Sequence, residues 1–153
     1  MKKILMIGGL IFIIGGGYCE VKKATIDEVK KSIKEVEKAV KKSDESLVEI
    51  YSEALEIEKR ATTPFLAERI MKEICKTAGI KEKEFKKIRE KHSFFDVSIG
   101  WAISQIVEIP LEKIMEEKKR ENWKGIIDRY FSGENYCKRE KIASKIIELN
   151  PRK

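Results

Sequence analysis

The sequence predicts an all-α protein, made of a signal helix, one long heptad-patterned helix and a compact bundle of about five or six short helices. Two observations predict this class. Apolar residues recur every three or four positions through most of the chain, and no segment alternates apolar and polar residues as a half-buried strand does. The 153 residues are also 39% charged, with only 9 Gly and 3 Pro to interrupt helices.

Residues 1–19 have the layout of a secretory signal peptide. A basic start at Lys2 and Lys3 precedes an apolar run over 4–14, and small residues follow up to Cys19. The apolar run is shorter than the roughly 20 residues that a membrane-spanning helix needs. We therefore expect an exported protein, periplasmic or secreted, which meets a membrane only if this segment stays uncleaved or carries a lipid.

A lipidated Cys19 is the alternative that would anchor the chain at a membrane. Lipoprotein signals place an aliphatic residue three positions before the cysteine and a small residue directly before it. Gly16 and Tyr18 occupy those positions here. The sequence therefore favours cleavage, after Gly17 or after Cys19, over a lipid anchor.

Residues 20–62 predict a long amphipathic helix. Thr25 and Glu28 have the spacing of a capping box, in which each side chain bonds the backbone N–H of the other. The apolar residues then follow a 3.5-residue repeat that is typical of a coiled coil. The first half of this helix carries a narrow seam that a partner helix would cover. That seam consists of Ile26, Val29, Ile33, Val36 and Val40.

The length of this helix decides how the seam would be used. One unbroken helix over 26–61 would be about 54 Å long, whereas the rest of the chain would form a globule about 30 Å across. Such a helix must project and offer its seam to a protein partner or to a second copy. The alternative is a break at 42–44, where Ser43 or Asp44 caps a second helix and the seam is buried internally. Because no Gly or Pro marks a turn there, we expect the continuous helix.

Residues 63–153 predict the bundle of short helices. Thr63 is an N-cap followed by proline at the first helical position, and Asp96 is an expected N-cap further along. Ser132-Gly133 is expected to end the helix that begins at Trp123. The expected helices run from Pro64 to near Gly79, over 81–91, from Asp96 to Val107, from Pro110, from Trp123 to Phe131, and over 136–149.

The sequence offers no constellation of catalytic, cofactor-binding or metal-binding residues, and we expect no enzyme. His92 is the only histidine, and its position predicts a cap at a helix C-terminus. Cys75 and Cys137 lack the close Cys/His spacing of a zinc site. In an oxidising compartment these two cysteines would form a disulfide, and the alternative is a pair of buried free thiols.

Two segments carry a resemblance to known proteins. Residues 95–103, Phe-Asp-Val-Ser-Ile-Gly-Trp-Ala-Ile, and residues 121–127, Glu-Asn-Trp-Lys-Gly-Ile-Ile, flank the short helix expected from Pro110. This arrangement resembles a set of small exported bacterial helical proteins of unknown function. The chain departs from their pattern where Phe95 and Asn122 replace glycines. The resemblance implies an all-helical fold and export, and it carries over no catalytic residue.

These observations predict an exported helical protein that acts as a binding or scaffold module through its long helix. The alternatives are a periplasmic chaperone-like or stress-response protein and a helix-turn-helix DNA-binding protein. Export excludes nucleic acid as the expected partner, despite the formal net charge of +7. The scarcity of Gln and Asn beside abundant Lys and Glu indicates a thermophilic source.

Overall fold

The computed structural model describes residues 21–150, and within this range every regular element is a helix. The predictions for residues 1–19, including Cys19, lie outside the described residues. None of the helices within the described range combines the length and the apolar character needed to cross a bilayer.

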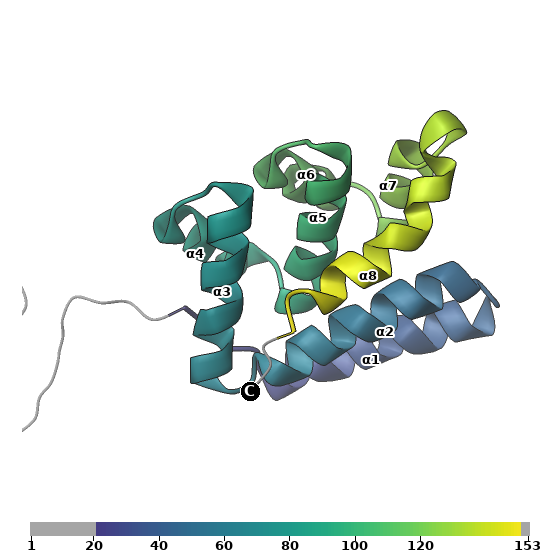
Figure 1. Ribbon diagram of the computed structural model, residues 1–153. Coiled ribbons are helices and arrows are strands. Elements are labelled where there is room, and N and C mark those ends of the chain that lie inside the picture. Colours follow the sequence, from purple (N-terminus) through teal and green to yellow (C-terminus); the bar gives the residue numbers. More distant parts are fainter. Residues whose placement is uncertain (1–20, 151–153) are drawn as a thin grey trace, which may run out of the picture.

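The first two helices form an antiparallel hairpin, so the prediction of one continuous helix is wrong. Helix α1 (Ile26–Lys41) and helix α2 (Glu45–Arg60) lie side by side (Figure 1). Ser43 turns the chain with a φ of 55°, in the left-handed region. Asp44 then caps α2 by accepting a hydrogen bond from the Leu47 N–H at 3.1 Å. The break occurs without Gly or Pro because the lysines at the end of α1 and the Asp44 cap stabilise the two new helix ends.

The capping box predicted at the start of α1 is confirmed. The Glu28 N–H donates to Thr25 Oγ1 at 3.1 Å, and the Thr25 N–H donates to Glu28 Oε1 at 3.0 Å. At the same end of the hairpin, the Ala24 N–H donates to the Ala61 carbonyl at 2.8 Å. The open end of the hairpin is thereby closed.

The remaining helices form a bundle across the hairpin (Figure 1). Helix α5 is central: its residues 97–104 are all buried, and it packs against α2 and α8. At Gly100 an added Cβ would collide with Met115 Sδ, so the glycine permits close packing of α5 against α6. The six α-helices described here are α3 (Pro64–Ala78), α4 (Glu82–Lys91), α5 (Phe94–Val107), α6 (Leu111–Lys118), α7 (Trp123–Tyr130) and α8 (Lys141–Ile147).

Two details of this bundle differ from the sequence prediction. Helix α5 begins two residues before the expected cap at Asp96, and Ser93 is its N-cap, accepting from the Asp96 N–H at 3.1 Å. The last predicted helix divides into a 3-10 helix, η1 (Gly133–Glu140), and α8. No apolar residue of η1 is buried, and the tighter 3-10 turn connects α7 to α8 without a core-facing stripe.

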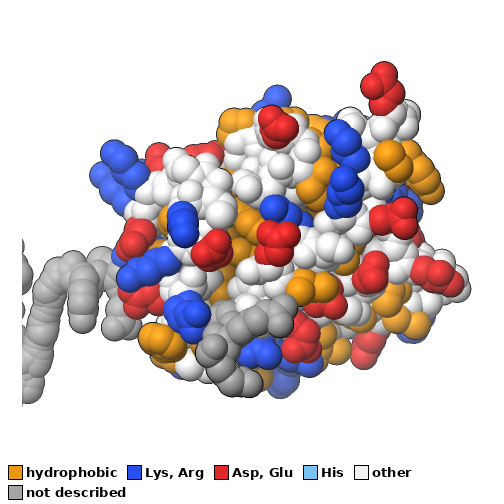
Figure 2. Space-filling view, viewed as in Figure 1, with side chains coloured by type: hydrophobic (Ala, Val, Ile, Leu, Met, Phe, Trp, Pro, Cys, Tyr) orange, Lys and Arg blue, Asp and Glu red, His pale blue; other side chains and the backbone are white. Residues whose placement is uncertain are grey.

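The surface mixes charges of both signs. On the side seen in Figure 2, basic and acidic side chains alternate with apolar ones and are not segregated by sign. Several of these charges pair along one helix, such as Lys72 with Glu68 at 3.5 Å. Exposed pairs of this kind contribute at most about 1 kcal/mol each, so the apolar core holds the bundle together.

Candidate functional site

The structure divides the predicted seam of α1 into a covered and an uncovered part. Val29 and Val36 are half-buried. Ile26 is 63% exposed, Ile33 36% and Val40 56%. The residues of α1 that face inward are instead Ser32 and Ala39. The seam therefore lies at the edge of the buried face rather than at its centre.

The uncovered residues form a stripe along the outside of the hairpin. Ile26, Ile33 and Val40 recur every seven residues, so consecutive members lie about 10.5 Å apart on one side of α1. Val48 and Leu55 of α2, also seven residues apart, are half-buried. We call these five residues the hairpin face. It offers a second helix or hairpin three exposed apolar residues on α1, flanked by two on α2 that the chain itself partly covers.

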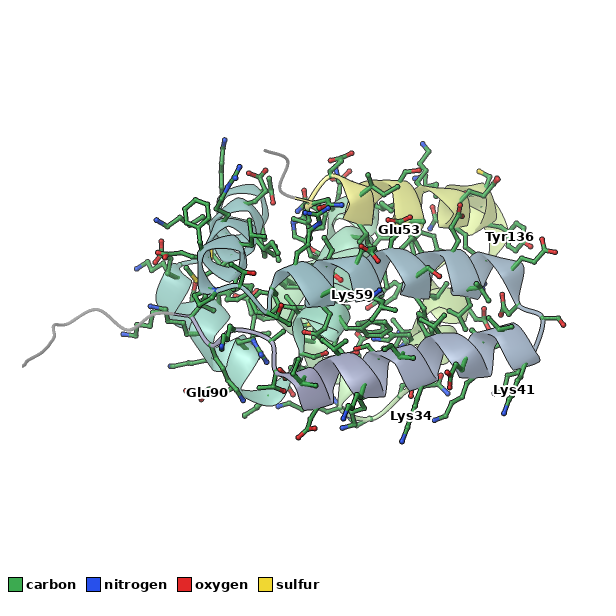
Figure 3. The ribbon with its side chains drawn as sticks, turned by 90° about the horizontal axis from the view of Figure 1, so that it is seen from below. Lys34, Lys41, Glu53, Lys59, Glu90 and Tyr136 are labelled. Atoms are coloured by element: carbon green, nitrogen blue, oxygen red, sulfur yellow. The ribbon has the colours of Figure 1, made fainter. Side chains whose placement is uncertain are left out.

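Charged residues of opposite sign border the hairpin face. Helix α1 carries Lys30, Lys34 and Lys41 on its outer side, whereas α2 carries Glu45 and Glu49. All five are exposed, and within residues 21–150 none forms an ion pair. Seen from below the molecule, Lys34 and Lys41 line the free edge of α1 (Figure 3). Glu37, which is also exposed, lies between Lys34 and Lys41 on the same side of α1, so this border is mainly basic, whereas the border on α2 is acidic.

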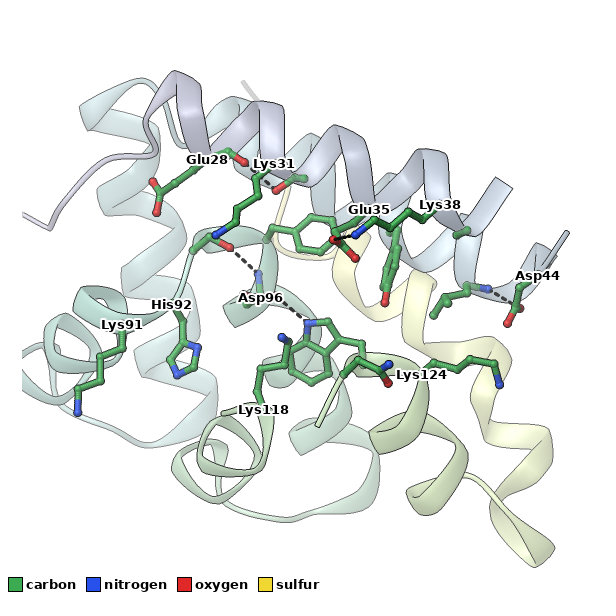
Figure 4. Close-up of a pocket in the computed structure, with 18 of the residues that line it drawn as sticks. Glu28, Lys31, Glu35, Lys38, Asp44, Lys91, His92, Asp96, Lys118 and Lys124 are labelled. Carbon is green, nitrogen blue, oxygen red and sulfur yellow. Dashed lines mark hydrogen bonds and ion pairs between the residues drawn. The ribbon is translucent and has the colours of Figure 1, made fainter. Parts of the chain in front are cut away.

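A cleft of about 670 Å³ opens on the other side of α1. Its walls come from α1, the connection between α4 and α5, and the connection between α6 and α7 (Figure 4). In the close-up, Lys31 extends from α1 above His92, while Lys118 approaches from α6. The volume is in the range of small-molecule sites.

Arg89 fixes one wall of this cleft. Its guanidinium is buried and donates to both Glu28 carboxylate oxygens, at 2.7 and 2.8 Å. It also donates to the backbone carbonyls of Lys22 and Lys23, each at 2.8 Å, and lies 4.9 Å from the centre of the Phe94 ring. Arg89 thus joins α4 to α1 and to the segment that enters α1.

The electrostatics of Glu28 follow from this contact. Burial acts to raise the pKa of Glu28, but the hydrogen bonds from Arg89 and Thr25 outweigh it and hold the pKa below its usual range. Glu28 is therefore an anion matched to Arg89 and is not available to another cation.

The floor of the cleft is aromatic. Tyr51 and Phe95 meet edge to face with ring centres 5.3 Å apart, and Trp123 donates from Nε1 to Asp96 Oδ1 at 2.7 Å. Tyr51 is 6% exposed, and its hydroxyl has no hydrogen-bond partner among the described residues. Burial and then the charges of Glu35 and Asp96 raise the pKa of Tyr51, which keeps the phenol neutral.

A buried carboxylate lies directly behind this floor. Glu58 of α2 is fully buried; its Oε1 accepts from the Phe95 N–H at 3.2 Å and from Ser32 Oγ at 3.4 Å. Its Oε2 is buried without a partner. Burial, aided by the charge of Glu28, raises the pKa of Glu58 from 4.5 to about 7, against the lowering by the Phe95 hydrogen bond. Glu58 is thus the carboxyl group, among the described residues, whose protonation changes near neutral pH.

The remaining candidates from the sequence are scattered. His92 is the C-cap of α4, as predicted, and half-buried at the cleft; burial lowers its pKa, against the charge of Asp96. Cys75 is buried on α3 and Cys137 is exposed on η1, and both are free thiols. Their disulfide stays a prediction. Within residues 21–150 no three His, Cys, Asp or Glu side chains gather as a metal site.

No protein-family model, curated protein or solved structure matches this chain. The features of this molecule that point to a function are therefore the hairpin face and the cleft.

Proposed function

We propose that this protein is an exported helical scaffold that binds a second copy of itself through the hairpin face and carries out no catalysis. The observation that carries the proposal is the seven-residue spacing of Ile26, Ile33 and Val40, all exposed. Covering such a stripe with a second apolar stripe is the usual basis of helix pairing. Export is proposed from the basic start, apolar run and small residues of 1–19.

Charge complementarity favours a second copy as the occupant and also selects its orientation. A two-fold axis parallel to the helices would place α1 of each copy over α2 of the other. The Lys34 side of one copy would then meet the Glu49 side of the other, with apolar stripes between them. An axis perpendicular to the helices would place α1 over α1, where Lys30, Lys34 and Lys41 of each copy meet the same three lysines and only one acid, Glu37; this arrangement is less favourable.

The size of the hairpin face predicts a weak dimer. A helix of 16 residues is about 24 Å long, and two helices side by side are about 20 Å wide. The face therefore covers on the order of 500 Å² per copy, below the roughly 800 Å² typical of stable complexes. We expect a monomer–dimer equilibrium that depends on concentration.

Light scattering coupled to size exclusion tests this proposal over a range of concentrations of the purified chain. We expect the mean mass to rise with concentration in the wild type and to stay monomeric in Ile33→Asp. Phe65→Asp is the matched control, because Phe65 is 67% exposed but lies on α3, away from the hairpin face. A wild type that stays monomeric, or an Ile33→Asp variant that dimerises as the wild type does, would contradict the proposal.

A further inference from the structure

We propose that residues 21–24, which we call the strap, dock against α2 and α4 when the protein folds, and that the signal segment is removed only before this docking. The order rests on the proposed export, because it concerns the two bonds, after Gly17 and after Cys19, at which residues 1–19 predict cleavage. The strap is separate from the hairpin face, so this order does not depend on self-association.

Arg89 holds the strap by its backbone. Nε of Arg89 donates to the Lys22 carbonyl and Nη2 to the Lys23 carbonyl, each at 2.8 Å. The Arg89 side chain is only 1% exposed, and the Glu28 carboxylate fixes the same guanidinium with a closest contact of 2.7 Å. Because hydrogen bonds from a charged donor are stronger than neutral ones, two successive peptide groups of the strap are held in place.

The strap is also anchored by its two apolar residues. Val21 is 6% exposed and Ala24 2%, and both belong to the apolar core. The Ala24 N–H donates to the carbonyl of Ala61, the C-cap of α2, at 2.8 Å. Lys22 and Lys23, by contrast, have exposed side chains. Undocking the strap therefore breaks three hydrogen bonds and exposes two core side chains.

A protease needs free chain around the bond that it cuts. It binds residues on both sides of that bond in an extended form, so cleavage of folded proteins concentrates where the backbone is exposed and not hydrogen-bonded. Glu20 alone separates the bond after Cys19 from Val21, and three residues separate the bond after Gly17 from Val21. Three residues reach at most about 11 Å. A docked strap therefore leaves too little free chain beyond either bond, whereas an undocked strap supplies it.

Digestion of the full-length chain by purified signal peptidase in mild detergent tests this order. Arg89→Met removes the donor that holds the strap but leaves every residue near both bonds unchanged. We expect the folded wild type to be cut about a hundredfold more slowly than Arg89→Met, since two hydrogen bonds from a charged donor are lost. Lys87→Met, at an exposed position on the same helix, should be cut as slowly as the wild type. Equal rates for the wild type and Arg89→Met would overturn the proposal.

A second variant acts on the strap from the other side. Ala24→Asp puts a charge at a buried position of the strap without changing α4. It should speed cleavage as Arg89→Met does, including the case in which circular dichroism shows that Arg89→Met has not folded. Cleavage of folded Ala24→Asp as slow as that of the wild type would overturn the proposal.

Trypsin, which cuts after lysine, reports on the strap without the signal segment. The bonds after Lys22 and Lys23 should resist trypsin in the wild type, although both side chains are exposed, and should be cut in Ala24→Asp. Equal rates in these two proteins would overturn the docking of the strap. If signal peptidase cuts neither the wild type nor any variant, the proposed export fails together with the order of events.

Discussion

Replacing Glu58 with Gln should remove a pH dependence of stability that the buried carboxyl creates. The pKa of Glu58 is about 7 in the folded protein and near 4.5 when the chain is unfolded. Between these values the unfolded chain releases the proton while the folded protein keeps it, so the free energy of unfolding falls as pH rises. One pKa unit corresponds to about 1.4 kcal/mol, so the loss from pH 4.5 to above 7 is about 3 kcal/mol.

The assay is urea denaturation of wild type and Glu58→Gln at pH 5 and pH 8, followed by circular dichroism. His92 titrates in the same window with the opposite sign: its lowered pKa makes stability rise with pH. At each pH, the free energy of unfolding of the wild type is subtracted from that of the variant. This removes the contribution of His92, which both proteins share. Part of the loss has already occurred at pH 5, so the difference should shift by about 2 to 3 kcal/mol in favour of Glu58→Gln between pH 5 and pH 8. A shift below about 1 kcal/mol would refute the reasoning.

Two further predictions test the wall of the cleft and the thiols. Arg89→Met removes the guanidinium that donates to the Glu28 carboxylate and to three backbone carbonyls, so it should cost about 3 kcal/mol or more of unfolding free energy in urea. Lys87→Met on the same helix, at an exposed position, is the control, and equal losses would contradict the role of Arg89. In the reduced protein, burial raises the pKa of the Cys75 thiol to about 11, whereas Cys137 is exposed. Iodoacetamide at pH 8 should therefore modify Cys137 first, as followed by mass spectrometry. Faster labelling of Cys75 would contradict the structure.

Much of the fold follows from local sequence signals. The capping box at Thr25, the proline start of α3 and the apolar spacing within each helix locate most helix ends within a few residues. The hairpin turn was missed because its φ of 55° falls on Ser43, a residue without the usual mark of a left-handed turn. The chain folds back at this turn because Val36 and Ala39 then pack against core residues that are distant in the sequence. No local pattern encodes that contact.

The cleft was harder to predict than the fold. Arg89 and Glu58 occur in charge-rich helices, where the sequence gives no sign that these two members are buried. Their burial follows from tertiary packing of α4 on α1 and of α2 on α5. The N-caps were the available signal: Asn122 and Ser93 each precede an apolar helix, but only the structure brings them to one cleft.

The pairing of two hairpins is tested most directly by exchanging charges across the proposed interface. Lys34→Glu would set a new carboxylate against Glu49 of the second copy, and Glu49→Lys would set lysine against lysine, so each variant alone should be monomeric. An equimolar mixture restores both attractive contacts and should form a dimer at concentrations where neither variant does. Analytical ultracentrifugation of the two variants and their mixture measures this. A mixture that stays monomeric where the wild type dimerises would contradict the account.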